Sequence, residues 1–551
     1  MIRRPSRAWR PSTRFVYAAL VGAALVATPI LALLLTALTP ASESLWPHLI
    51  ANVIPQALRD TVLLLLGVGL VCGTVGVGTA WIVTQYEFTG RRQLEWLLVL
   101  PLAMPTYITA YIYVEILGFQ GPLQTALRTM TGWRSLRDYW FPDPRNLLGA
   151  ILIMSAVLYP YVYLTVRTLF GMQGATMVEA ARTLGASRRR LFWRIALPMA
   201  RPALVAGLTL ALLEALNDIG ASEHLGVRTL TVSIYTTWLN RNSLSGAAQI
   251  ATLMLVIVVM LMLLEARLRG QRRYALSVKQ PRPVARRPLH GGASALAATL
   301  CALPVVFGAA LPGGFLIAQV LQRDLLLQAD AALLGQLANA LLYSAAATIL
   351  VVGFGLAIVV ALRRGRESWL PLARRTASLG YAIPGTVLAL GLLIPIAALD
   401  NRLADTARAM FGAELGLVLI GSGAALVIAY AVRFLAIAVS GVESGFSRIS
   451  PRIDDAARAL GSDNRRLLRR VHWPLLRPAL AAATLLVFVD CLKELPATLL
   501  LRPLNVETLA TVVYGHASRG VFEDGALASL LIVLAGLYPA YRLARSSPMG
   551  D

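Results

Sequence analysis

Long apolar runs separated by short charged segments dominate this sequence. Runs without Asp, Glu, Lys or Arg occupy residues 15–38, 61–84, 96–114, 146–166, 242–264, 291–322, 331–362, 376–399, 415–432 and 526–541. Two more runs begin at Pro202 and Pro478 and meet an acidic residue late, at Glu214 and Asp490. Since a bilayer span needs about 20 predominantly apolar residues, the pattern predicts twelve membrane spans.

These runs show no strand pattern, and helices are one of two ways to satisfy every backbone polar group in lipid. We therefore expect an all-α, polytopic membrane protein. The first run is longer than the apolar core of a signal peptide, and no clear small-residue cleavage site follows it promptly. We expect residues 15–38 to remain as the first helix.

Composition narrows the class further. The chain has 551 residues, of which 57% are hydrophobic and 14% are charged, and its mean hydropathy is +0.66. Soluble chains carry about 25% charged residues, so a soluble enzyme of several domains is excluded. The net charge of +23 comes from basic clusters between apolar runs, which fits membrane orientation rather than nucleic-acid binding.

Basic residues also predict the orientation and the division of the chain. Most Lys and Arg residues fall on the side of the predicted membrane that holds the N-terminus. The positive-inside rule then places both termini in the cytoplasm of a bacterial inner membrane. Residues 266–290 are rich in Arg and Pro, and we interpret them as a cytoplasmic linker. It would join two halves of six helices each, residues 1–265 and 291–551.

The two predicted halves contain a repeated segment. Residues 178–204 and 454–480 align without a gap at an offset of 276, and 14 of 27 positions are identical. Both copies fall between the fourth and fifth spans of their half, on the predicted cytoplasmic side. Small residues after an acidic residue suit a short helix that another protein docks on, and the Gly that follows suits its end. A duplicated segment implies a duplicated partner, unless it is only a relic of fusion.

The first copy has the pattern Glu-Ala-Ala, three residues, Gly, nine residues, Ile, one residue, Leu-Pro. This pattern resembles the coupling loop of ATP-binding-cassette (ABC) importer permeases, and the resemblance extends over essentially the whole chain. In that family the loop's helix docks on the ATP-hydrolysing subunit. The second copy departs from the pattern at Asp455, Val471 and Trp473. The resemblance assigns the coupling role to these residues: Glu179, Ala180, Ala181, Gly185, Ile195, Pro198, Asp455, Ala456, Ala457, Gly461 and Pro474.

The chain itself has no ATP-binding loop of the P-loop type. Such a loop places a Lys directly after Gly, and neither Lys279 nor Lys493 follows one. We therefore expect no enzyme and no cofactor in this chain. ATP and Mg²⁺ would belong to two copies of a separate ABC ATPase subunit, and a periplasmic binding protein would deliver the substrate.

Ionisable residues inside membrane spans are costly and therefore become functional candidates. The repeat offset pairs two such groups: Glu214, Asn217 and Asp218 with Asp490, Lys493 and Glu494. They are candidates for lining the substrate path. The alternative is an ion pair or helix cap near the outer interface, and Lys493 is spaced to pair with Asp490. No metal ligand set can be firmly assigned.

Other residues near the spans have simpler interpretations. Tyr107, Tyr111 and Tyr113 fit either a pore lining or an interfacial aromatic belt, and we expect the belt. We expect Arg167 and Arg433 to be snorkelling anchors. Prolines of the third spans, at 101, 105 and 384, would break or kink their helices.

The substrate prediction follows from resemblance. The segments PLAMPTYITAYIY, EALNDIGASEHLGVRTLTVSIYTTWLNR and LKELPATLLLRPLNVETLATVVY are similar to those of bacterial ferric iron permeases. Carboxylates are hard oxygen donors that suit Fe(III), although many substrates tolerate them. Thiamin is the alternative substrate, phosphonates are a third, and an ion-coupled secondary transporter is the alternative of another class.

Overall fold

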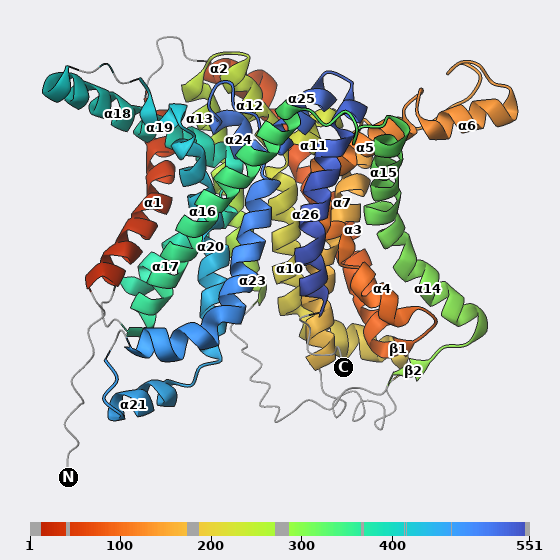
Figure 1. Ribbon diagram of the computed structural model, residues 1–551. Coiled ribbons are helices and arrows are strands. Elements are labelled where there is room, and N and C mark those ends of the chain that lie inside the picture. The colour runs from red at the N-terminus through yellow and green to blue at the C-terminus, as the bar shows by residue number, and fades with distance from the viewer. Residues whose placement is uncertain are drawn as a thin grey trace. The chain divides into compact units, whose positions relative to one another are not determined.

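The computed structural model describes residues 13–39, 45–172, 187–269, 286–364, 369–412, 414, 416–463 and 466–545 (Figure 1). The regular structure of these residues is helical, apart from one parallel pair of two-residue strands, β1 (Tyr86–Glu87) and β2 (Arg287–Pro288), and turns and loops connect the elements. The predicted all-α membrane class is confirmed. Eleven helices in the described part are long and apolar enough to span a membrane, or twelve if one bent pair is a single span.

The bent pair replaces the straight third span predicted at 96–114. Its arms, Arg91–Ala103 and Thr106–Thr131, meet at 94°. Pro105 stands at the break, as the residue before α5 (Thr106–Leu117). Pro384 has the same place between α17 (Leu370–Leu379) and α18 (Gly385–Phe411). A proline lacks a backbone donor and cannot continue the preceding helix, so both third spans are broken rather than kinked.

The chain divides into two compact units that do not coincide with the sequence halves. The α20 unit consists of Met1–Ser44, Thr237–Thr252 and Asp330–Thr511. The α7 unit consists of Leu45–Thr236, Leu253–Ala329 and Val512–Asp551. Each unit therefore contains helices from both halves of the sequence. Residues 270–285 of the predicted linker lie outside the described part.

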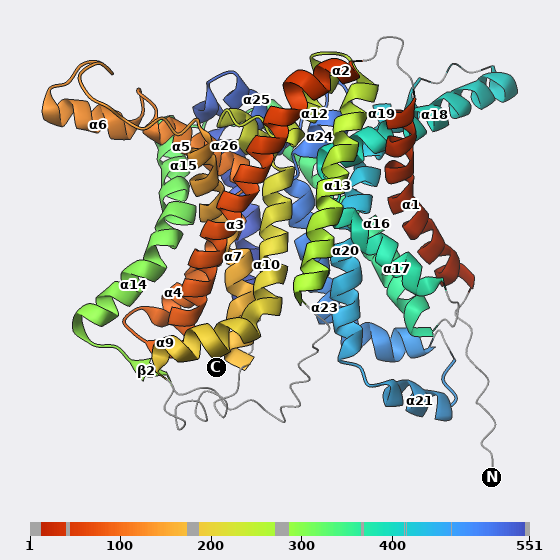
Figure 2. The ribbon, with the colours of Figure 1, turned by 180° about the vertical axis from the view of Figure 1, so that it is seen from behind.

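The α20 unit is built around α20 (Figures 1 and 2). Its elements are α1 (Thr13–Leu38), α16 (Ala331–Arg364), α17, α18, α19 (Val418–Gly421), α20 (Ala424–Ser447), α21 (Pro451–Ala459), α23 (Trp473–Leu492) and α24 (Pro496–Leu501). The helices α16 and α23 pack against α20 and against each other. From the opposite end of the sequence, α1 packs on α16, α17 and α18.

The α7 unit is built around the long contact between α3 and α7, with α10 against both. Its elements are α2 (Trp46–His48), α3 (Ile54–Gln85), β1, α4 (Arg91–Leu97), α5, α6 (Pro122–Thr131), α7 (Leu147–Met172), α9 (Arg188–Leu191), α10 (Leu197–Asn217), α11 (Ile219–His224), β2, α14 (Gly291–Val305), α15 (Leu311–Gln322) and α26 (Ala526–Arg545). Helices α12 (Leu230–Leu239), α13 (Leu244–Arg269) and α25 (Leu509–Ser518) have residues in both units. From the second half, α14 packs on α3 and α4, while α15 packs on α5 and α26.

This exchange of helices predicts that the halves stay together without the covalent linker. When residues 1–265 and 291–551 are expressed as separate chains, we expect them to copurify from detergent extracts, because α1 packs on α16–α18 and α14 on α3 and α4. Affinity purification through a tag on one chain measures this. Recovery of the tagged chain alone would contradict the packing described here.

Candidate functional site

Two buried carboxylates occupy equivalent places where the spans α10 and α23 end. Asp218 follows α10 and caps α11: its Oδ1 accepts a hydrogen bond of 2.8 Å from the Ala221 backbone N–H. Glu494 lies 276 residues later and accepts, through Oε1, a hydrogen bond of 2.9 Å from the Ala497 N–H. Side-chain caps satisfy backbone donors that a helix start leaves free. The helix-cap alternative considered for these candidates is therefore present in both copies.

The remaining partners of the two carboxylates differ. Asp218 accepts a second hydrogen bond from the Thr106 hydroxyl, at the start of α5. Glu494 instead forms an ion pair with Arg433 of α20, with 3.0 Å between Oε1 and Nη1 and side chains only 1% and 7% exposed. Glu494 Oε2 also accepts hydrogen bonds from the Thr498 N–H and hydroxyl, at 3.0 and 2.7 Å. The donor from the neighbouring element is thus a hydroxyl for Asp218 and a guanidinium for Glu494.

Gly385 makes room for this guanidinium. It follows Pro384 at the start of α18, as Thr106 follows Pro105 at the start of α5. A Cβ atom on Gly385 would lie 2.4 Å from Arg433 Nη1 and 2.7 Å from Glu494 Oε1. Only glycine permits this approach. The expectation that Arg433 is a snorkelling anchor is wrong, because the side chain is buried and paired inside the protein.

The other path candidates lie beside these carboxylates. Lys493 and Asp490 form the ion pair expected from their spacing, with 2.8 Å between Nζ and Oδ1. In the other copy, Asn217 is buried and Glu214 is half-buried, one turn before Asp218. Among the described residues no three His, Cys, Asp or Glu side chains group as a metal site. The structure places the candidates together within each copy, and their role in transport stays a prediction.

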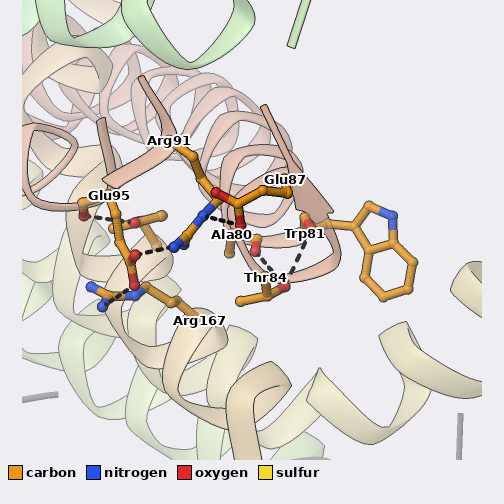
Figure 3. A network of polar contacts seen from close by, with 8 residues as sticks. Ala80, Trp81, Thr84, Glu87, Arg91, Glu95 and Arg167 are labelled. Atoms are coloured by element: carbon orange, nitrogen blue, oxygen red, sulfur yellow. Dashed lines mark hydrogen bonds and ion pairs between the residues drawn. The ribbon is translucent and has the colours of Figure 1, made fainter. Parts of the chain in front are cut away.

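Arg167, the second expected anchor, is also buried in an ion-pair network, which connects α4 to α7 (Figure 3). Glu95 Oε1 lies 2.6 Å from Arg167 Nη2, and Glu95 Oε2 lies 2.7 Å from Arg91 Nη1. Arg91 also pairs with Glu87 at 2.9 Å, and the Tyr163 hydroxyl donates to the Glu95 carbonyl at 2.9 Å. The interpretation of Arg167 as an exposed anchor is therefore wrong as well.

The acidic residue, the two alanines and the glycine of the coupling segment lie within the described residues only in the second copy. Glu179, Ala180, Ala181 and Gly185 lie outside the described residues, whereas Ile195 and Pro198 lie at the start of the α10 span. In the second copy, Asp455, Ala456 and Ala457 are part of α21, which lies beyond the ends of α20 and α23 in both views (Figures 1 and 2).

Gly461 follows the C-terminal end of α21. Its φ of +77° is the left-handed conformation that its spacing in the motif predicts. Pro474 is the second residue of α23, directly after the π-helical turn Leu467–His472. Ile453 and Leu460, at the two ends of the segment, are 40% and 88% exposed. Single exposed apolar side chains are common on protein surfaces, so the docking role of α21 stays a prediction.

A buried ion-pair cluster, which no sequence motif indicates, attaches α21 to the spans. Asp454 Oδ2 lies 3.0 Å from Arg363 Nε, and Asp454 Oδ1 lies 2.7 Å from His472 Nε2. Arg363 also donates to the carbonyls of Phe446 and Ile449, at 3.1 and 3.0 Å. Burial alone would raise the pKa of Asp454, but the hydrogen bonds from His472 and Arg363 outweigh it and lower the pKa below its usual value. The carboxylate therefore stays ionised at neutral pH.

The repeat contained a signal for this cluster. At the offset of 276, Asp454 corresponds to Val178 and His472 to Ala196. Two ionisable residues that replace apolar ones in an otherwise similar segment require partners, because unpaired buried charges are costly. The cluster therefore distinguishes the second copy from the first.

The helical spans, the paired breaks and the repeated segment define an integral membrane transport subunit with two related halves. Residues 73–273 and 353–545 match the family of binding-protein-dependent transport system inner membrane components. The chain belongs to this family, with two copies of its domain. The resemblance to fused ABC importer permeases is thereby confirmed, as is the multi-pass inner-membrane class.

Three relatives indicate what members of this family carry. The chain is 25% identical to the Fe(3+)-transport system permease protein FbpB 2 of Haemophilus influenzae, over 89% of this chain and 90% of that protein. It is 34% identical to the sulfate transport system permease protein CysT of Escherichia coli, over 27% and 50% of the two chains. It is 26% identical to the molybdenum transport system permease protein ModB of Escherichia coli, over 34% and 82%.

The Arg433–Glu494 pair predicts a large loss of stability when one partner is removed. Arg433→Ala should lower the free energy of unfolding by about 3 kcal/mol, because it leaves a buried carboxylate without its cation. Arg408→Ala is the matched control, since its pair with Glu414 is 69% and 83% exposed and should contribute less than about 1 kcal/mol. Denaturant unfolding in detergent measures both. Equal losses would contradict the buried geometry.

Proposed function

We propose that this chain is the permease subunit that moves ferric iron from a periplasmic binding protein into the cytoplasm. The observation that carries the proposal is the match to an Fe(3+) permease along nearly the full length of both chains. The sulfate and molybdenum relatives match only about a third of the chain or less. Membership of a binding-protein-dependent family also favours an ABC importer over an ion-coupled carrier.

The partners of the candidate carboxylates favour a cation over an oxyanion. A site for sulfate or molybdate needs basic side chains aimed at the substrate. In the described candidate set, Arg433 and Lys493 are each paired with a carboxylate. Asp218, in contrast, receives its hydrogen bonds from a hydroxyl and a backbone N–H. Carboxylates of this kind suit a hard metal cation, and thiamin remains the alternative cation.

We further propose that α21 and its first-half counterpart couple the permease to two ATPase subunits. When ATP closes these subunits, a docked α21 moves with them. The Arg363–Asp454–His472 cluster then transfers this motion to α16 and to the start of α23, because it connects the three elements directly. With both termini in the cytoplasm, α21 lies on the side where ATP is available.

The substrate prediction is tested by uptake in cells that carry this chain with its neighbouring transport genes. We expect labelled Fe(III) to accumulate and labelled molybdate, sulfate and thiamin not to, since Asp218 offers an anionic site. Uptake should stop on ATP depletion and survive collapse of the proton gradient. Uptake of an oxyanion or of thiamin alone would refute ferric iron as the substrate. Uptake that needs only the proton gradient would refute the ABC mechanism.

The coupling proposal is tested with Asp454→Asn. This change keeps the shape but removes charge-assisted hydrogen bonds that contribute about 1.5–3 kcal/mol, so transport should fall about tenfold or more. ATP hydrolysis by the associated ATPase should persist, because the docking surface of α21 remains. Asp405→Asn, on an exposed part of α18, is the control and should change neither rate. Parallel loss of transport and ATP hydrolysis would contradict a transmitting role.

A further inference from the structure

A group of oxygen and nitrogen donors surrounds Tyr111 in the α7 unit. Tyr107 and Tyr111 come from α5, Glu223 and His224 from α11, and Tyr514 from α25. The ring centroids of Tyr107 and Tyr111 are 5.9 Å apart, and those of Tyr111 and His224 are 4.6 Å apart. The Tyr514 hydroxyl donates to Glu223 Oε2 at 2.7 Å. We call these five residues the tyrosine cluster.

Two contacts fix how α11 lies along α5. At one end, the Thr106 hydroxyl donates to Asp218, and at the other the Tyr111 ring meets the His224 ring. Both helices therefore run in the same direction past each other. This alignment places Asp218 at one end of α11 and the tyrosine cluster at the other. Both Asp218 and Glu223 interact electrostatically with Tyr111.

Polar atoms in this region lack hydrogen-bond partners among the described residues. Tyr111 is 1% exposed, and its Oη has no hydrogen bond; neither do His224 Nε2 and the buried Ser222 Oγ on α11. Buried polar groups are nearly always satisfied, so each exception needs an explanation. Unsatisfied phenol and imidazole groups beside a carboxylate are explained if they bind a ligand during the transport cycle.

The donor types suit a hard metal cation. Phenolate and carboxylate oxygens are hard donors, imidazole suits iron, and tyrosinate is a known axial ligand of haem iron. Carboxylates and histidines alone do not form a site among the described residues, so the phenol has to complete it. Arg145 acts electrostatically on His224, but the groups that act on Tyr111 are carboxylates and phenols.

We propose that Tyr111, Glu223 and His224 form a transfer site that holds Fe(III) during its passage through the permease, an assignment that rests on the proposed iron substrate. When the metal binds, the O–H bond of Tyr111 breaks and an Fe–O bond forms. The proton passes to solvent, as ligand deprotonation on metal binding requires. No electron is transferred, and the iron stays ferric. Tyr514 positions Glu223 through its hydrogen bond.

Spectroscopy tests this site independently of transport. The purified full chain in detergent is titrated with Fe(III)–nitrilotriacetate, and a visible phenolate-to-iron charge-transfer band should appear. Tyr111→Phe should abolish the band, and Glu223→Gln should weaken iron binding about tenfold or more, at least as much as loss of a supporting partner does. Ga(III), which has no such visible band, should compete with Fe(III) for the site.

Tyr159→Phe is the matched control. Tyr159 is also fully buried, and its hydroxyl also lacks a hydrogen bond among the described residues, but it lies on α7 outside the tyrosine cluster. It should leave the band unchanged. A band that survives Tyr111→Phe, or that Tyr159→Phe removes equally, would overturn the proposal.

The iron uptake assay separates this inference from the proposed function. If cells take up Fe(III) but the purified chain shows no band, the transfer site is wrong and the substrate stands. If neither appears, both are wrong. Uptake by Tyr111→Phe at the rate of the unchanged chain would also refute the transfer site.

Discussion

Each half of this permease depends on one buried carboxylate where a long span ends and a short helix begins, after α10 in one half and after α23 in the other. In a membrane, a backbone donor released by a helix break has no water to bind and has to be satisfied within the protein. Asp218 and Glu494 satisfy the first donors of α11 and α24. Each also accepts a hydrogen bond from a neighbouring element, Thr106 or Arg433. These contacts position the short helices α11 and α24 and the residues around them.

The partners of the two carboxylates differ between the copies. Arg433 neutralises Glu494, and Gly385 leaves space for the guanidinium. Asp218 receives a hydroxyl hydrogen bond instead, and α11 leads from it to Tyr111 and His224. At the other end of the spans, the second copy has the Arg363–Asp454–His472 cluster where the first has Val178 and Ala196. The two copies of the duplicated fold therefore differ in their buried polar contacts at both ends of the spans.

The sequence predicts the class and the repeat well, because both depend on local composition. Apolar runs mark the spans whatever their neighbours, and Pro105 and Pro384 mark the breaks. The offset of 276 pairs Asp218 with Glu494 before any geometry is known. It also exposes the substitutions at Asp454 and His472.

The sequence does not reveal which distant residues meet. Arg433 precedes Glu494 by 61 positions, and Arg363 precedes Asp454 by 91. Spans that face lipid and spans that face protein are both apolar, since lipid supplies no hydrophobic contrast. The pattern of apolar residues therefore does not reveal that α1 packs on α16–α18. In the sequence the tyrosines of the third span are equally suited to an interface, and the ring contact with His224 distinguishes Tyr111.

The most direct test of the account is ATP hydrolysis in proteoliposomes that contain this chain and its ATPase, with binding protein added outside. Binding protein loaded with Fe(III) should stimulate hydrolysis, whereas empty protein or protein offered molybdate should not. Stimulation that is independent of iron, or that molybdate alone produces, would contradict the account of a ferric iron permease coupled to ATP.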